Sequence, residues 1–338
     1  MPTDDIAALA RAISLVENQR EGFEDVLLQA HAGLGRTTGR RLGITGPPGA
    51  GKSTLVVHLV QRYRAAGLRV AVVAVDPTSP FSGGALLGDR IRMDAVSMDP
   101  GVFIRSMATR GSHGGLATAT AEVADVLEAF GFDRVIVETV GVGQTELDVA
   151  RTADTTALVL VPESGDGIQA LKAGVMEIAD VFLVNKGDRP GADKVKQEIE
   201  VMLGIRRGNA FRHVTAHHGR GTGRAERPAT GPVVWEPPVV TTVGVTGQGV
   251  DEFVAALDAH HAWLVATGAL GARRRERLVA RTRTVVERAL RRWAWDEMGA
   301  EDLVAARLDD VATGRKSPYE VAAEVMSHVK TGASHEPD

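Results

Sequence analysis

Short apolar runs recur along the first two thirds of the chain, and stretches with helical periodicity lie between them. Nearly continuous apolar runs, without alternation of polar and apolar positions, are typical of parallel strands buried on both faces. These runs fall at 69–76, 102–107, 133–139, 156–162, 181–186 and 239–243, and a shorter one with Leu42 and Ile44 precedes them. Helix-like segments occupy 53–66, 116–130, 169–178 and 192–203.

This strand–helix alternation predicts an α/β fold with a doubly wound, mostly parallel sheet. A ligand of such a sheet is expected at the carboxyl ends of its strands. Ahead of the sheet, apolar residues at helical spacing predict an amphipathic helix over 4–20, and a second apolar set continues toward Gly33. The first set is Ile6, Leu9, Ile13 and Val16, and the second is Phe23, Val26 and Leu27.

The sequence becomes wholly helical after Asp251, with an apolar stripe on an Arg-rich segment at 273–292. The arginines form either a solvated face, balanced by acidic residues at 296–302, or an arm that binds a partner or a second subunit. Ser317 and Glu320 form a capping box around Pro318, which predicts a last helix to about 329 and a disordered tail from 331. The stripe consists of Leu278, Val285, Val286, Ala289, Leu290 and Trp293.

Residues 206–232 lack apolar periodicity and are rich in Gly, Arg, His and Thr, so we expect a mobile surface loop there. Its His213, His217 and His218 raise the alternative of a metal site, but no Cys and no carboxylate at ligand spacing accompanies them. The expected organisation is an N-terminal helical extension (1–38), a nucleotide-binding domain (39–268), a C-terminal helical arm (269–330) and a tail (331–338).

The composition narrows the class of protein. The 338 residues are 44% hydrophobic with a net charge of −4, which gives enough material for a large core and no bias toward nucleic acid. The absence of Cys excludes disulfides, thiolate metal sites and Cys nucleophiles. No signal or transit pattern is seen at the N-terminus, and no apolar run approaches the roughly 20 residues that span a bilayer. We therefore expect a cytoplasmic protein without a membrane or nucleic-acid partner.

Residues 46–53 fit the pattern G-x-x-x-x-G-K-[ST], between a strand-like run and a helix-like run. This context indicates a phosphate-binding loop, in which backbone N–H groups and a helix N-terminus surround a phosphate. Lys52 is expected to reach the β- and γ-phosphates, and the Ser53 hydroxyl to hold Mg²⁺. The nucleotide-binding set here is Gly46, Pro47, Pro48, Gly49, Ala50, Gly51, Lys52, Ser53 and Thr54.

Asn185, Lys186 and Asp188 form an N-K-x-D motif after a strand-like run. A carboxylate at Asp188 can accept both the N1–H and the exocyclic amine of guanine, whereas adenine would leave it unpaired. Sites built on such a pair can discriminate by roughly 10⁴ or more. Lys186 is expected to pack along the base, and Asn185 to tie this loop to the phosphate side. The predicted ligand is therefore GTP or GDP.

Glu138 and Gly141 end another strand and resemble the D-x-x-G turn of GTPases, with Glu in place of Asp. The Gly141 amide is placed to sense the γ-phosphate, and Glu138 to contact Mg²⁺, which prefers oxygen ligands. Asp76 and Asp89 are further carboxylates expected near that edge, so the metal set is Ser53, Asp76, Asp89 and Glu138. An alternative for Asp89 is an N-cap of a helix at 90–98.

Longer motifs make the chain resemble the MeaB/ArgK family of P-loop GTPases, over roughly residues 6–330. The similar segments include 76–80 (DPTSP), 83–93 (GGALLGDRIRM), 138–144 (ETVGVGQ) and 162–172 (PESGDGIQALK). The resemblance implies a SIMIBI-type GTPase fold, with the C-terminal arm joining two copies as a homodimer. It also places Lys172 in an additional switch loop that couples nucleotide to a partner.

The function implied by the resemblance is hydrolysis of GTP to GDP and phosphate by a chaperone of an adenosylcobalamin-dependent acyl-CoA mutase, most often methylmalonyl-CoA mutase. Such a protein gates cofactor loading from a cobalamin adenosyltransferase and protects or reactivates the mutase. Mg²⁺ is the implied cofactor, and cobalamin itself is not expected to bind directly.

Two features of the site depart from the resemblance or stay open. Val243 and Gly244 stand where the family often has Ser-Ala, so backbone N–H groups of Val243, Gly244 and Val245 are left to reach the guanine O6.

The catalytic candidates are Lys52, Asp89, Glu138, Gly141 and Gln144. Gln144 or Asp89 would orient the attacking water, although Gln144 is equally consistent with a surface side chain. No arginine finger is assigned, although Arg92 and Arg110 are near in sequence.

Three other functions stay open at this point. A nickel-delivery or other metallocentre-assembly GTPase shares the core, but it would need a Cys/His site that this chain lacks. A kinase would need a second substrate site, which no motif specifies. A chaperone of a different cobalamin mutase, for isobutyryl- or 2-hydroxyisobutyryl-CoA, shares every motif above.

Overall fold

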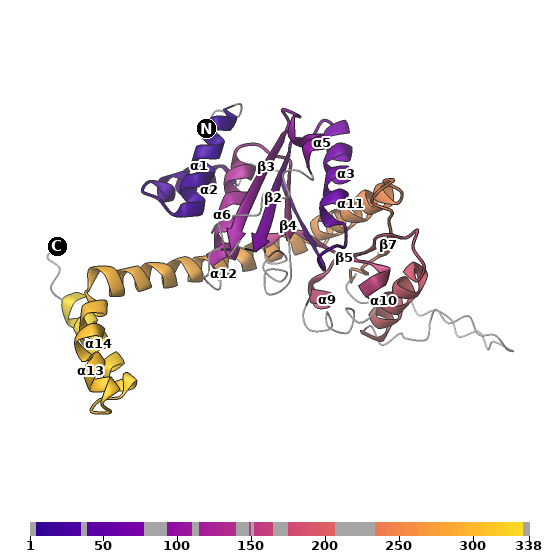
Figure 1. The fold of residues 1–338 in the computed structure, drawn as a ribbon. Helices are drawn as coiled ribbons and strands as arrows, with labels where there is room; N and C mark the ends of the chain where they lie inside the picture. Colours follow the sequence, from indigo (N-terminus) through magenta and orange to yellow (C-terminus); the bar gives the residue numbers. More distant parts are fainter. Residues whose placement is uncertain are drawn as a thin grey trace. The chain divides into compact units, whose positions relative to one another are not determined.

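The apolar runs form one parallel sheet in the computed structural model (Figure 1). Among the residues that the structure describes, the sheet has seven strands in the order β3-β2-β4-β1-β5-β6-β7. This confirms the parallel sheet that the alternation predicts. The strands are β1 (Arg40–Thr45), β2 (Val70–Pro77), β3 (Val102–Thr109), β4 (Arg134–Thr139), β5 (Thr155–Leu160), β6 (Val181–Val184) and β7 (Val239–Thr241).

The structure describes residues 5–34, 39–77, 93–109, 115–139, 149, 152–164, 175–206 and 234–333. The side chains of Asp76 and Pro77 lie outside this description. The chain divides into two compact units, 1–274 and 275–338. The predicted loop at 206–232, with its three histidines, falls outside the described residues apart from Arg206.

Strand β2 shows why the apolar runs are continuous. Val70 and Val72 belong to the core on one face of the sheet, and Ala71, Val73 and Val75 belong to the core on the other face. Because side chains alternate between the two faces of a strand, a strand covered on both faces needs apolar residues at every position.

Helices cover both faces of the sheet. On one face lie α3 (Lys52–Ala65), α11 (Val250–Ala266) and the short α5 (Asp94–Ser97). The other face carries α6 (Gly115–Ala129), α9 (Val175–Ile178) and α10 (Ala192–Arg206). Helix α5 covers part of the segment 90–98, and Met93 occupies its N-cap position. Asp89 lies outside the described residues, so both of its expected roles stay predictions.

The two N-terminal helices are part of the first unit and not a separate layer. Helix α1 (Ile6–Asn18) buries Leu9, Ile13 and Val16, and both α1 and α2 (Phe23–Leu34) pack on α6. Glu17 of α1 also accepts a hydrogen bond from Nε of Arg105 on β3, at 3.1 Å. The predicted helix over 4–20 is therefore confirmed with slightly narrower bounds.

A polar cluster lies at the amino ends of β5 and β6, within the first unit. The Asp180 carboxylate accepts the Thr156 N–H at 3.0 Å and two hydrogen bonds from Arg273, at 2.8 and 3.0 Å. His260 is fully buried beside it, with Nε2 3.3 Å from Asp180 Oδ1 and Nδ1 2.9 Å from Thr155 Oγ1. Burial lowers the pKa of His260 to about 4, against the opposing effect of Asp180.

Arg274 forms a further ion pair at the same edge of the sheet, next to that of Arg273. Its guanidinium binds the buried Asp154 carboxylate at 2.6 Å and donates to the Gly39 carbonyl at 2.8 Å. Arg273 and Arg274 belong to α12 (Ala269–Arg292), so the first turns of this helix are fastened to the sheet. This accounts for the division after Arg274, six residues beyond the boundary expected at 268.

The second unit contains the rest of α12, a π-helical turn (Trp293–Glu297), α13 (Ala300–Ala312) and α14 (Pro318–Ala333). The capping box at the start of α14 is confirmed, since Ser317 N–H donates to Glu320 at 2.7 Å and Glu320 N–H donates back to the Ser317 hydroxyl at 3.2 Å. Helix α14 continues to Ala333, so residues 331–333, expected in a disordered tail, are helical.

No residue of α12 is buried, although its apolar stripe is present. Among the described residues, no helix combines the length and apolar character needed to cross a membrane. The exposed large apolar residues of the stripe are Leu278, Val285, Val286 and Leu290, and Val279 beside them is exposed as well.

Candidate nucleotide-binding site

The phosphate loop, residues 46–53, follows the carboxyl end of β1, the strand between β4 and β5. Two of its glycines are required by close contacts. A Cβ on Gly46 would lie 2.1 Å from the Val159 carbonyl oxygen, and a Cβ on Gly51 would lie 2.5 Å from Nδ2 of Asn185. Both glycines also have positive φ, at 139° and 85°. The loop therefore fits against β5 and Asn185 only without side chains at these positions.

Lys52 begins α3 and turns back over the phosphate loop. Its ammonium group is buried and donates to the carbonyl oxygens of Gly46 and Pro47, at 2.7 and 2.9 Å. The positive charge is thus held at the loop itself, where a bound phosphate would lie. This agrees with the position expected for the phosphate-binding lysine.

Ser53 and Glu138 meet at the edge of the sheet that faces the phosphate loop. The Ser53 hydroxyl donates to Glu138 Oε1 at 2.7 Å, and both side chains are buried. A hydroxyl and a carboxylate are oxygen donors of the kind that Mg²⁺ accepts. No cluster of three or more His, Cys, Asp or Glu side chains suited to a metal occurs among the described residues. Two protein ligands suit Mg²⁺, because it usually keeps waters and phosphate oxygens as its other ligands.

Asn185 connects the phosphate loop to residues 243–249, which we name the base loop. Its Nδ2 donates to the Ala50 carbonyl at 2.7 Å, while its Oδ1 accepts the Gly244 N–H at 2.9 Å and the Thr242 hydroxyl at 3.2 Å. The side chain is 3% exposed. This confirms that Asn185 ties its own loop to the phosphate side, and it shows a further link that was not expected.

The remaining motif residues surround a left-handed turn. Lys186 has φ of 56°, and the Gly187 N–H donates to the Thr242 carbonyl at 2.9 Å. Lys186 and Arg189 both form ion pairs with Glu163, in the short helical turn Pro162–Ser164. The backbone N–H of Glu163, followed by Arg189 and Lys186, lowers the pKa of its carboxyl. The start of the segment 162–172 is therefore held against the N-K-x-D turn.

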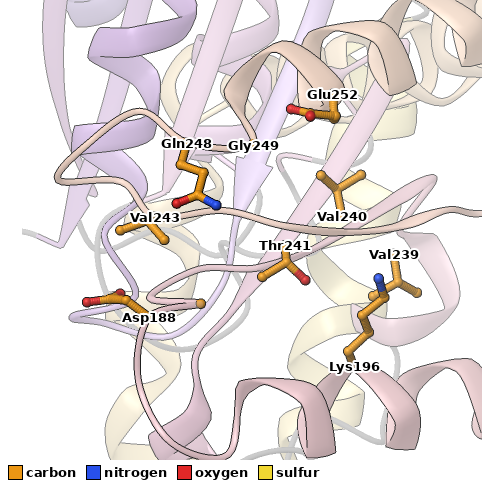
Figure 2. A pocket seen from close by; sticks show the side chains of 10 residues that line it. Asp188, Lys196, Val239, Val240, Thr241, Val243, Gln248, Gly249 and Glu252 are labelled. Carbon is orange, nitrogen blue, oxygen red and sulfur yellow. The ribbon is translucent and has the colours of Figure 1, made fainter.

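Asp188 is exposed at one end of a cavity of about 490 Å³. Figure 2 shows Asp188 and Val243 at one end of the lining residues and Val239 and Lys196 at the other. The cavity follows the outer edge of β7, between α10 and α11. An exposed carboxylate at the mouth of a cavity, beside a loop tied to the phosphate side, is placed to meet a ligand.

The base loop differs in one respect from the expectation. The Gly244 N–H, expected to reach the guanine O6, already donates to Asn185, whereas Val245 is 92% exposed. The Gly244 carbonyl accepts a hydrogen bond from Nε2 of His58 on α3, at 2.8 Å. Sequence reasoning missed His58, because a lone histidine on an amphipathic helix gives no signal for a contact with a loop so distant in sequence.

Several predicted site residues lie outside the described structure. Asp89, Gly141, Gln144 and Lys172 belong to this group, as do Arg92 and Arg110. Asp76 is described only by its backbone, near the end of β2. Their expected roles stay predictions. Of the proposed metal set, the structure brings together Ser53 and Glu138.

Comparisons with known proteins agree with this geometry. A family model described as "Methylmalonyl Co-A mutase-associated GTPase MeaB" matches residues 9–298. A protein of Pyrococcus horikoshii, named as a candidate GTPase, is 46% identical over 282 residues, which cover 83% of this chain and 82% of the relative. The mouse "Methylmalonic aciduria type A homolog, mitochondrial" is 34% identical over 283 residues, 79% of this chain and 63% of the relative.

Among solved structures, one described as "LAO/AO transport system kinase" matches with a TM-score of 0.60. The match covers 96% of this chain and 99% of the other, at 24% sequence identity. At this level of identity the likeness shows a shared fold. Together with the family model, it agrees with the P-loop fold predicted from the sequence.

Proposed function

The chain belongs to the MeaB family of methylmalonyl-CoA mutase-associated GTPases, and from this membership we propose that it acts as a nucleotide-gated chaperone of an adenosylcobalamin-dependent acyl-CoA mutase. GTP hydrolysis itself follows from the family and from its relatives named as GTPases. The proposal concerns what hydrolysis serves: control of cofactor loading, and protection or reactivation of the mutase.

The observation that carries the proposal is the position of Asn185. This one side chain bonds Ala50 of the phosphate loop and Gly244 of the base loop. A protein that reports its nucleotide must link the part that binds phosphate to the parts that recognise the base and contact a partner. Glu163 extends this link, because it joins the start of the segment 162–172 to Lys186 and Arg189.

The chemical step requires positioning and charge stabilisation more than covalent chemistry. Lys52 supplies positive charge at the phosphate loop, and the backbone N–H groups of the loop and of the start of α3 surround the phosphates. Ser53 and Glu138 would hold Mg²⁺, which would neutralise part of the charge of the phosphates. Asp188 would accept the two guanine N–H groups that adenine lacks.

The exposed stripe of α12 supports a homodimer joined through this helix. A shallow cavity lies on the surface of this helix. Its apolar lining residues are Leu278, Val279 and Val286, and its polar ones are Arg275, Thr282, Arg283 and Glu287. An amphipathic helix with no buried residue leaves apolar area that a second copy would cover. Dimerisation would place two nucleotide sites in one assembly.

Association with the mutase under defined nucleotide states tests this function. The chain is loaded with GDP or with a non-hydrolysable GTP analogue and titrated with purified methylmalonyl-CoA, isobutyryl-CoA and 2-hydroxyisobutyryl-CoA mutases in separate experiments. We expect one mutase to bind, with an affinity that differs between the two nucleotides. Equal affinity in both states for every mutase that binds, or no binding to any, would contradict the proposal.

A further inference from the structure

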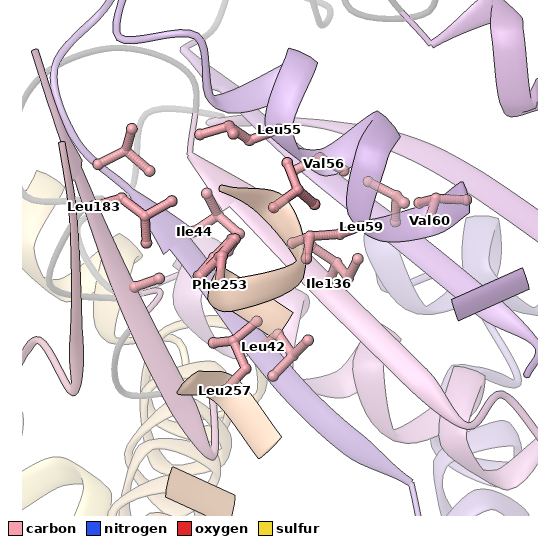
Figure 3. Packing of buried hydrophobic residues seen from close by; sticks show 14 of the residues in the cluster. Leu42, Ile44, Leu55, Val56, Leu59, Val60, Ile136, Leu183, Phe253 and Leu257 are labelled. Atoms are coloured by element: carbon pink, nitrogen blue, oxygen red, sulfur yellow. The ribbon is translucent and has the colours of Figure 1, made fainter. Parts of the chain in front are cut away.

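Helix α3 provides a rigid support directly after the phosphate loop. Its Leu55, Val56, Leu59 and Val60 are fully buried against the sheet (Figure 3). His58 lies on the same helix, five positions after Ser53, and its imidazole reaches the base loop. Nε2 of His58 is 2.8 Å from the Gly244 carbonyl oxygen. A side chain on the helix that begins at the phosphates therefore contacts the loop that faces the base.

The base loop is held from two sides at one residue. Gly244 donates its N–H to Asn185 Oδ1 at 2.9 Å, and its carbonyl faces His58. A Cβ on Gly244 would lie 3.3 Å from the Asn185 amide, so the backbone approaches Asn185 closely. With both ends of its backbone bound, Gly244 is fixed relative to both α3 and the N-K-x-D turn.

The His58 ring also packs beneath the turn of the loop. A Cβ on Gly247, which has φ of +77°, would lie 3.1 Å from His58 Cε1 and 3.3 Å from Nδ1. The Gly247 and Thr246 N–H groups both donate to the Val243 carbonyl, which closes the turn over the ring. The imidazole thus fills the space between α3 and the loop while it binds the loop backbone.

The chemistry of the contact assigns the proton. A carbonyl oxygen only accepts, so Nε2 of His58 must donate. Nδ1 is buried and has no hydrogen-bond partner among the described residues. In the neutral ring with its proton on Nε2, Nδ1 is an acceptor.

We propose that His58 is a positioning residue for the guanine base: it holds the base loop so that the backbone N–H of the exposed residue Val245 is presented to the 6-oxygen. This rests on the guanine site proposed above. The base loop carries Val243-Gly244 where the family often has Ser-Ala. The backbone of Gly244 is more flexible than that of an alanine, and the hydrogen bond from His58 to its carbonyl holds it in place. His58 contacts neither the base nor the phosphates and acts through Gly244.

Binding of two diphosphates, one of which lacks the 6-oxygen, tests this role. Dissociation constants are measured for GDP and for the diphosphate of 2-aminopurine riboside, which keeps the N2 amine and lacks both the 6-oxygen and the N1–H. His58→Ala should raise the Kd for GDP about tenfold, the size expected for one hydrogen bond, and leave the Kd for the analogue nearly unchanged. The KM for GTP should rise with kcat unchanged.

Matched variants separate positioning from a general loss of structure. His58→Gln places an amide nitrogen the same number of bonds from Cβ as Nε2, so it should restore most of the GDP affinity. His58→Leu fills the space without a donor and should behave as His58→Ala does. Gln61→Ala, at an exposed position of the same helix, should change nothing. Equal weakening for both diphosphates, or an unchanged Kd for GDP in His58→Ala, would overturn the proposal.

A parallel variant distinguishes failure of this inference from failure of the guanine site. Asp188→Asn should shift preference from guanosine to xanthosine diphosphate, because the amide then offers a donor where the 2-position carries a carbonyl. If Asp188→Asn shifts preference and His58→Ala has no effect, the guanine site stands and the role of His58 is wrong. If Asp188→Asn leaves the preference for GDP intact, both are wrong.

Discussion

The side-chain nitrogen of Asn185 donates a hydrogen bond of 2.7 Å to the carbonyl oxygen of Ala50, which precedes it by 135 residues. Ala50 lies in the phosphate loop, and Asn185 begins the turn that carries Asp188. The same amide accepts the Gly244 N–H. The three loops expected to contact phosphate and base are thus joined by one buried side chain.

Asn185→Ala should separate these loops. It leaves the Ala50 carbonyl and the Gly244 N–H without their partner, and each buried unsatisfied group costs about 1–3 kcal/mol. We expect the free energy of unfolding in urea to fall by about 2–4 kcal/mol and GDP affinity to fall with it. Asn18→Ala, which removes an amide bonded to Ser14 within α1, is the control and should cost less than about 1 kcal/mol. A similar loss in both variants would argue against a special role for Asn185.

Ser53→Ala should weaken magnesium binding while the fold persists. The hydroxyl is the proposed ligand, and its bond to Glu138 orients that carboxylate. The Mg²⁺ concentration for half-maximal GTP hydrolysis should rise about tenfold or more, in the range seen when metal-supporting residues are removed. Ser97→Ala, whose hydroxyl bonds the Asp94 carbonyl in α5, serves as the control. An unchanged magnesium requirement would exclude Ser53 from the metal site.

His260 should make the first unit sensitive to acid. Its pKa is about 4 in the folded chain, below the ordinary value near 6.5, so the unfolded chain binds the proton first. The stability conferred by neutral His260 is complete above pH 6.5 and is lost as the pH falls toward 4. Between pH 7.5 and 5 this corresponds to about 2 kcal/mol.

The measurement is the free energy of unfolding at pH 7.5 and at pH 5 for three proteins. His260→Gln should lose about 2 kcal/mol less than the unsubstituted chain over this interval. His328→Gln, which alters an exposed histidine of α14, should follow the unsubstituted chain. An equal loss in all three would show that His260 does not govern this acid sensitivity.

The stripe on α12 should govern the oligomeric state. Val286→Glu places a charge in the apolar face, which a second copy would have to desolvate, so we expect monomers by sedimentation velocity. Arg291→Glu introduces the same residue on the opposite side of the helix and should leave the dimer intact. GTP hydrolysis by the chain alone should persist in both variants, because neither residue lies in the first unit. A monomeric unsubstituted chain would remove the basis for the proposed dimer.

Local sequence signals predicted the features that depend on local burial and backbone geometry. The apolar runs marked the strands, because each is covered on both faces, and the glycines of 46–51 marked a loop where Gly46 and Gly51 have no room for a Cβ. Ser317 and Glu320 marked a helix start, since both partners of a capping box lie within one turn.

Long-range polar pairs were not predictable in the same way. Arg273 and Arg274 were interpreted as part of a basic face or a partner-binding arm, whereas they bind Asp180 and Asp154 at the amino ends of strands. Periodicity shows that a helix has a polar side and does not show which distant carboxylate will meet it. His58 and Gly244 show the same limit, since 186 residues separate them and the glycine offers only its backbone.

The most direct test of nucleotide gating is the rate of GTP turnover with and without a mutase. The mutase used is the one that binds the chain in the association experiment proposed above. The chain is held at fixed concentration with saturating GTP and Mg²⁺, and released phosphate is followed as the mutase is added. We expect slow turnover by the chain alone and a marked, saturable increase with the mutase, because the proposed gating couples hydrolysis to the partner and phosphoryl transfer depends on positioning and charge stabilisation. Turnover of tens per second by the isolated chain, unchanged by the mutase, would contradict the account.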